Sequence, residues 1–170
     1  MPSGRVHEAI NLTALGMGGI AFLAYGGSPE EPGALAFALA YLAGTFLLSP
    51  DLDLAEKGVR AQGRWGLLGL LWRPYGWLFR HRGLSHTWIL GPLTRLGYLA
   101  ALLAVLGFAV GELARFLGVG LPLSFSLGQA GWGKEVWGLA LLGYYLSQWL
   151  HLVADGIWPD HDLRRLKRPR

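Results

Sequence analysis

Histidine and carboxylate side chains occur as four pairs along this chain of 170 residues. The pairs are His7 with Glu8, Asp51 with Asp53, His81 with His86, and His151 with Asp155. Imidazole nitrogens and carboxylate oxygens are ligands that suit zinc, manganese or iron. The chain has no cysteine, which excludes a thiolate zinc finger, a disulfide scaffold and a catalytic cysteine. The four pairs therefore predict a divalent metal site with nitrogen and oxygen ligands.

The last of these pairs is the most informative. His151 and Asp155 are four residues apart, so they share one face of a helix. They also interrupt an apolar stretch, where an ionisable side chain is costly and usually functional. Taken alone, each pair has a simpler explanation: a polar helix start, a turn after Pro50, a basic surface loop, or a solvated helix end.

The number of candidate ligands indicates more than one ion. Without Glu8 the pairs supply seven potential ligands, whereas one tetrahedral zinc ion takes four. Asp51 or Asp53 can bridge two ions, as in two-metal hydrolytic sites. Arginines adjoin the ligands in the sequence and can bind phosphate through both guanidinium nitrogens, or can simply mark the cytoplasmic side of a membrane. These arginines are Arg5, Arg80 and Arg82.

Four apolar stretches have to position these groups. They cover residues 9–25, 34–49, 88–110 and 136–157, and they show no alternation of period two, so we predict helices. The metal-binding candidates open the first helix, close the second, precede the third and lie late in the fourth. If each helix crosses a membrane, all four pairs lie on the same side of it.

Composition and charge indicate a membrane protein. Hydrophobic residues make up 52% of the chain and charged residues only 15%, which also excludes a disordered chain. With four spans, one side carries twelve Lys and Arg residues, or thirteen with Arg95, and the other side carries two. This asymmetry predicts the inner membrane with both termini cytoplasmic. The basic tail, residues 163–170, then contacts lipid head groups and no nucleic acid. A soluble four-helix bundle is the alternative, because the first two stretches are shorter than a span of roughly 20 residues.

Two features near the cytoplasmic side have their own predictions. Residues 65–79 are rich in Trp and Leu but too short to span, so we expect an interfacial helix on the cytoplasmic face. A buried re-entrant segment is the alternative for these residues. Arg95, close to the start of the third helix, is expected to extend its charged end to the membrane surface.

Four motifs in this order resemble a bacterial family of metal-binding membrane proteins of unknown function. The motifs are MPSGRVH, SPDLD, WRPYGWLFRHRGLSHT and HLVAD, and they extend over nearly the whole chain. The chain is similar, more distantly, to membrane-bound metal-dependent hydrolases of the YdjM type. That wider group carries HRG-x-[ST]-H, D-x-D and H-x-x-x-D elements. Its metal site is similar in design to that of zinc-dependent, all-helical phospholipase C enzymes.

This resemblance implies roles for individual residues. Glu8 would be a general base or would lie next to the ligands. Apart from the resemblance, the position of Arg82 next to the ligands in the sequence leads us to expect that it holds a phosphate. The metal ligands implied are His7, Asp51, Asp53, His81, His86, His151 and Asp155.

We therefore expect a single all-α domain over residues 1–170, an integral membrane bundle of four spans with an interfacial helix. Its metal site is expected to be dinuclear, to bind zinc or else manganese or iron, and to lie at the cytoplasmic helix ends. The expected function is hydrolysis of a phosphoester in a lipid or lipid-linked substrate by a metal-activated water. A non-catalytic protein in which the ion ties helix ends together or is sensed is the first alternative. A soluble all-helical enzyme with the same site is the second.

Overall fold

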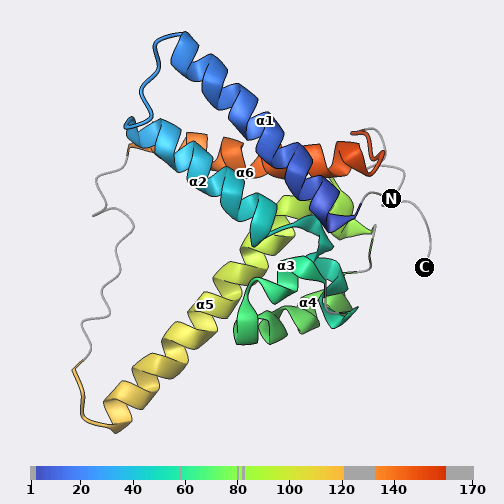
Figure 1. Ribbon diagram of the computed structural model, residues 1–170. Helices are drawn as coiled ribbons and strands as arrows, with labels where there is room; N and C mark the ends of the chain where they lie inside the picture. The colour runs from blue at the N-terminus through green and yellow to red at the C-terminus, as the bar shows by residue number, and fades with distance from the viewer. Residues whose placement is uncertain (1–2, 58, 80, 82, 121–132, 160–170) are drawn as a thin grey trace.

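The computed structural model describes residues 3–57, 59–79, 81, 83–120 and 133–159, and every regular element in these ranges is a helix (Figure 1). The long helices are α1 (Gly4–Ala24), α2 (Pro32–Phe46), α5 (Leu90–Phe116) and α6 (Lys134–Ala154). Short helices between α2 and α5 are η1 (Pro50–Lys57), α3 (Arg60–Gly63), η2 (Gly66–Trp72), α4 (Arg73–Leu78) and η3 (Leu84–His86). The predicted all-α fold class is confirmed for this part of the chain, and each predicted apolar stretch overlaps one long helix.

Helices α2 and α6 pack against each other and run in the same direction. Near the start of the contact Phe37 faces Gly143, and further along Gly44 faces Gln148. A Cβ atom built on Gly143 would lie 2.2 Å from the carbonyl oxygen of Phe37, so only glycine allows this approach. Two parallel neighbours far apart in sequence are what the expected topology requires, since both helices would run toward the cytoplasmic side.

Replacing Gly143 with alanine should therefore destabilise the protein by about 1–3 kcal/mol, because the added methyl group meets backbone that cannot rotate away. Gly138 on the same helix is a matched control, since a Cβ atom there meets nothing within 4 Å. Gly138→Ala should be neutral or stabilising by up to about 1 kcal/mol. Thermal unfolding of both variants in detergent measures the difference. Equal melting temperatures would show that α2 and α6 are not in this contact.

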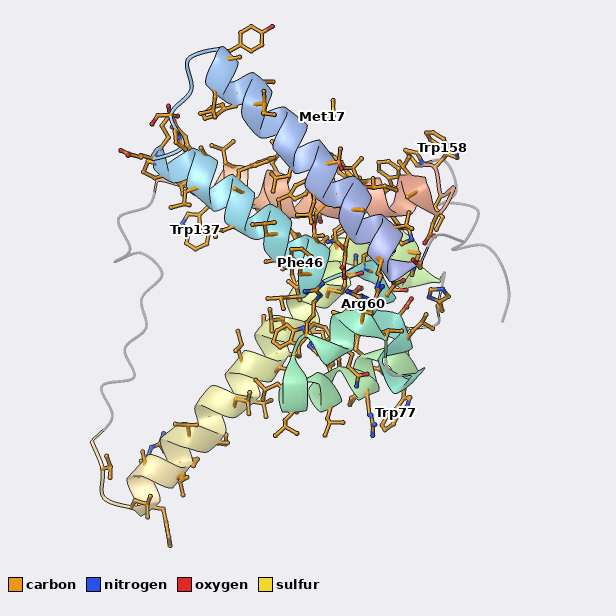
Figure 2. The ribbon with its side chains drawn as sticks, viewed as in Figure 1. Met17, Phe46, Arg60, Trp77, Trp137 and Trp158 are labelled. Carbon is orange, nitrogen blue, oxygen red and sulfur yellow. The ribbon has the colours of Figure 1, made fainter. Side chains whose placement is uncertain are left out.

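The segment at residues 65–79 differs from the prediction of one interfacial helix. It forms η2 and α4, and Trp72 and Tyr75 are fully buried. These two side chains pack with Leu48, Leu52 and other buried residues in the hydrophobic core under the short helices. Only part of the segment's apolar surface is outward, including Trp77 on α4, which is 70% exposed (Figure 2). The single-helix prediction is wrong because the aromatic side chains of the segment divide between a core and a surface.

Large apolar side chains remain exposed along α1 and α5. Met17 lies on the outer face of α1 (Figure 2) and is 68% exposed. Phe116, at the end of α5, is 87% exposed. Three helical stretches are long and apolar enough to cross a membrane: Gly4–Ala24, Pro32–Leu54 and Leu90–Phe116. Among the described residues, α6 does not meet the same measure of length and hydropathy. The structure thus has three such helices where the sequence predicted four spans.

The helix ends separate into two groups in space. In Figure 1 the end of α1 lies at the top, the starts of α2 and α6 lie at the left, and the end of α5 lies at the bottom. The opposite ends of these four helices converge toward the centre and right, beside α3 and α4. All four pairs of metal-binding candidates belong to this second group of ends.

Candidate metal centre

The seven predicted ligands form one connected group, which we call the His–Asp cluster. Its members come from α1, η1, the segment at residues 81–86 and the last turn of α6. They are His7, Asp51, Asp53, His81, His86, His151 and Asp155. Each member lies in at least one set of three whose potential ligand atoms are all within 4.8 Å of one another.

The first half of the cluster consists of His7, His151 and Asp155. The Nε2 atom of His7 lies 3.4 Å from Oδ1 of Asp155, and the Nε2 atom of His151 lies 3.7 Å from Oδ2. The two imidazole rings stack with their centroids 3.8 Å apart. Two imidazoles from opposite ends of the chain thus face one carboxylate.

The second half consists of Asp53, His81 and His86. Asp53 is buried, and its carboxylate accepts a hydrogen bond from the Ser85 hydroxyl at 2.5 Å. The Nδ1 atoms of His81 and His86 lie 2.9 Å and 3.1 Å from the same carboxylate. Asp53 could therefore bind the same metal ion as these imidazoles. Alternatively, it could orient the two rings so that their Nε2 atoms bind a metal ion.

Asp51 lies between the two halves. It forms a set with His86 of the second half and His151 of the first, and its Oδ1 atom lies 3.6 Å from Nε2 of His151. Asp53 does not enter a set with His151 among the described residues. Of the two aspartates that the sequence offered as a bridge, the geometry favours Asp51.

Several polar atoms of the cluster are buried without a hydrogen bond in the described part of the chain. They are Nδ1 of His7, Nε2 of His86, Nε2 of His151 and both carboxylate oxygens of Asp155. An unpaired buried polar atom costs roughly 1–3 kcal/mol, and more when it is charged. Outside the cluster, the described residues contain one further atom of this kind, in Arg95. Concentration of such atoms at one place fits a site that a cation completes.

The protonation state of His86 agrees with this interpretation. Burial lowers the pKa of His86, although the neighbouring Asp53 carboxylate opposes this effect. A lowered pKa favours the neutral imidazole at neutral pH. The neutral form is the one that binds a metal ion.

Local structure fixes the two acidic parts of the cluster. Leu52, the residue between Asp51 and Asp53 in the sequence, is fully buried in the hydrophobic core. Its burial holds the short helix η1 in place. At the other acidic site, Gly156 has a φ of 71° directly after Asp155. The next amide, of Ile157, donates to the carbonyl of Leu152 at 2.9 Å and so closes a glycine-terminated helix end. The helix therefore stops where Asp155 faces His7.

The position of the Arg95 side chain differs from the prediction. It was expected to extend to a membrane surface, but it is fully buried. Its guanidinium donates to the carbonyl of Ser85 at 2.9 Å and to Oε1 of Gln148 at 2.9 Å. Gln148 in turn donates to the carbonyl of Gly44 at 3.0 Å. This hydrogen-bond network joins α2, α5, α6 and the Ser85–His86 segment. In the sequence, only the presence of two polar residues, Arg95 and Gln148, in apolar stretches indicates it.

The predicted catalytic residues Glu8 and Arg82 have different outcomes. Glu8 lies beside the cluster, and its Oε2 atom is 3.3 Å from Arg60 and 2.9 Å from Arg64. This carboxylate is thus ion-paired with two arginines that the sequence analysis did not single out. Arg82 and Arg80 lie outside the described residues, and Arg5 is exposed.

Comparison with known proteins gives a family and one curated relative. Residues 2–165 match the family described as "Uncharacterized metal-binding protein (DUF2227)". An "Uncharacterized protein" from Aquifex aeolicus (strain VF5) is 36% identical over 131 residues, which cover 70% of this chain and 86% of the relative. No solved structure matches the chain.

Proposed function

The chain belongs to the DUF2227 family of uncharacterized metal-binding proteins, and from this membership we propose that it is a membrane-embedded, metal-dependent hydrolase. Its substrate would be a phosphoester in a lipid or a lipid-linked molecule. The observation that carries the proposal is the concentration of unpaired buried nitrogen and oxygen atoms in the His–Asp cluster. The seven candidate ligands of the cluster come from four separate segments and number more than one tetrahedral ion requires.

In this proposal the cluster holds two divalent ions, with zinc expected and manganese or iron as alternatives. His7, His151 and Asp155 would hold one ion and Asp53, His81 and His86 the other, while Asp51 could contribute to both. The cluster has three carboxylates and four imidazoles, so two divalent ions would leave a net positive charge. A positive centre favours an anionic substrate such as a phosphoester.

A metal pair of this kind lowers the pKa of a bound water and stabilises the oxygens of a phosphoryl centre. The chain's own residues would then orient the substrate and carry protons. Glu8 and Arg60 line a pocket that also contains His7, Asp51 and His151. This pocket adjoins the cluster on the side of α1 and α3.

The membrane part of the proposal rests on exposed apolar surface and on aromatic positions. The outward faces of α1 and α5 carry large hydrophobic side chains that water would not solvate well. Trp137 and Trp158 mark the two ends of α6, as expected for a helix between two membrane surfaces (Figure 2). The charge asymmetry supports the proposal that both termini lie on the cytoplasmic side of the inner membrane. Extraction should require detergent, and release from membranes by salt alone would contradict this part.

Elemental analysis and turnover of one detergent-purified preparation test the proposal. We expect about two equivalents of a divalent metal per chain and hydrolysis of at least one compound in a panel of phospholipids and other phosphoesters. Turnover should disappear after chelation and return with the metal. A preparation that holds the metal tightly but hydrolyses none of the panel would contradict the hydrolase assignment.

The same cluster supports a non-catalytic alternative, in which the ion ties helix ends together or is sensed. The observation in its favour is that one cluster joins α1, η1, the segment at residues 81–86 and α6. A structural site has all its positions filled by protein, whereas a catalytic site keeps one open for water or substrate. X-ray absorption spectroscopy at the metal edge that found only protein ligands at each ion would favour this alternative.

A further inference from the structure

A pocket beside the His–Asp cluster combines the cluster with hydroxyl and arginine side chains. His7, Asp51 and His151 contribute to its lining, and so do Thr45, Ser49 and Arg60. The cavity itself is small, with a volume of about 20 Å³, so a larger group would lie at its edge. Nδ1 of His7 and Nε2 of His151, in two of the residues that line it, are buried without hydrogen bonds among the described residues.

Two arginines meet on Glu8 at the edge of this pocket. Oε2 of Glu8 lies 2.9 Å from Arg64 and 3.3 Å from Arg60. Arg64 is also held from a second direction, because its guanidinium lies over the ring of Phe46 at 4.3 Å from the centroid. Arg60 lines the pocket and keeps about half of its side chain exposed (Figure 2).

The charges in this group select the kind of ligand that fits. Two guanidinium groups and one carboxylate leave one positive charge at the pocket edge. A guanidinium has five N–H donors, and the bond to Glu8 uses one N–H of Arg60. The planar guanidinium can direct two parallel N–H groups at two oxygens of a phosphate, whereas a lysine ammonium acts as a point charge.

We propose that Arg60, positioned by Glu8, binds the phosphate group of the substrate at the edge of the pocket beside the His–Asp cluster. This inference rests on the proposed function and deepens it, because it names the residue that recognises the substrate's anionic group. Glu8 then acts as a positioning residue for Arg60. The phosphate can belong to a lipid head group or to a free phosphate compound, since the recognition chemistry is the same.

Binding of inorganic phosphate to the zinc-loaded, detergent-purified protein tests this inference by calorimetry. Arg60→Met should weaken phosphate binding at least tenfold, while zinc content stays at the wild-type level. Arg60→Lys should bind with intermediate affinity, because lysine keeps the charge and loses the paired donors. Arg73→Met is the matched control, since Arg73 is an exposed arginine on α4 that does not line this pocket, and its phosphate affinity should equal that of the wild type.

A second arm separates the two sources of phosphate. Dioctanoyl phosphatidic acid in the same detergent should bind more tightly than inorganic phosphate if a lipid is the natural source, and no more tightly if it is not. In both cases Arg60→Met must lower the affinity.

Each failure has a distinct meaning. Wild-type affinity in a zinc-loaded Arg60→Met protein would overturn this inference and leave the proposed metal site intact. Absence of phosphate binding by the zinc-loaded wild type would overturn it as well. Failure of the wild type to retain any metal would instead overturn the proposed function.

Discussion

Replacement of His151 by alanine should lower the metal content, from the two ions per chain of the proposed function to one or fewer. His151 belongs to two of the three sets of potential ligands, which is more than His7 or His81 contributes. Its Nε2 atom faces Asp155 at 3.7 Å and Asp51 at 3.6 Å. Loss of even an outer partner of a metal ligand typically costs about 10–100-fold in affinity, so loss of a ligand should cost at least that much. Elemental analysis after dialysis measures the effect.

Two comparisons give this result its meaning. Glu112→Ala on α5 should keep the full metal content, because Glu112 pairs with Arg115 away from the cluster. His81→Ala should remove only the ion of the second half and leave about one per chain. Equal stoichiometry in the His151 and Glu112 variants would contradict the site. A wild-type content of one ion would make Asp53 a residue that orients His86, since Nδ1 of His86 already faces it.

Replacement of Arg95 by alanine should destabilise the protein by about 3–5 kcal/mol. The variant loses two charge-assisted hydrogen bonds and leaves the Ser85 carbonyl and Gln148 Oε1 buried without them. It also opens a cavity at a fully buried position. Because Ser85 precedes His86, the same change should weaken metal binding. Thermal or denaturant unfolding in detergent measures the loss.

An exposed arginine is the appropriate control for Arg95. Arg73→Ala on α4 should change the free energy of unfolding by less than about 0.5 kcal/mol. Arg95→Met, which restores most of the volume, should recover part of the loss and leave the share due to hydrogen bonds. An Arg95→Ala protein as stable as the wild type would show that Arg95 does not join α5 to α6 and the Ser85 segment.

The helices and their approximate ends were predictable because they follow from local properties. Apolar stretches long enough to form helices, interrupted by glycine and proline, require only neighbouring residues to be recognised. The expected stretches at 9–25 and 88–110 thus correspond to α1 and α5. The meeting of the four pairs was predictable for a related reason, since the order of helices assigns each pair to one of two ends.

The placement of individual side chains was less predictable. The same segment contains buried Trp72 and exposed Trp77, although both are tryptophans in an amphipathic-looking stretch. Arg95 is buried because Gln148, 53 positions away along the chain, accepts its hydrogen bond. Glu8 pairs with Arg60 and Arg64, which lie more than 50 positions away. No local pattern distinguishes these partners from the other polar residues of the chain.

The sequence by itself determined the helical class, the metal-binding residue types and the end of the molecule at which they gather. Hydropathy and chain order are sufficient for these, because each is a property of consecutive residues. Only the tertiary structure decided that Asp51, and not Asp53, lies between the two halves, and that Arg60 and Glu8 share the pocket. Those relations depend on distances of a few ångströms between helices, which close packing sets through all of the side chains at once.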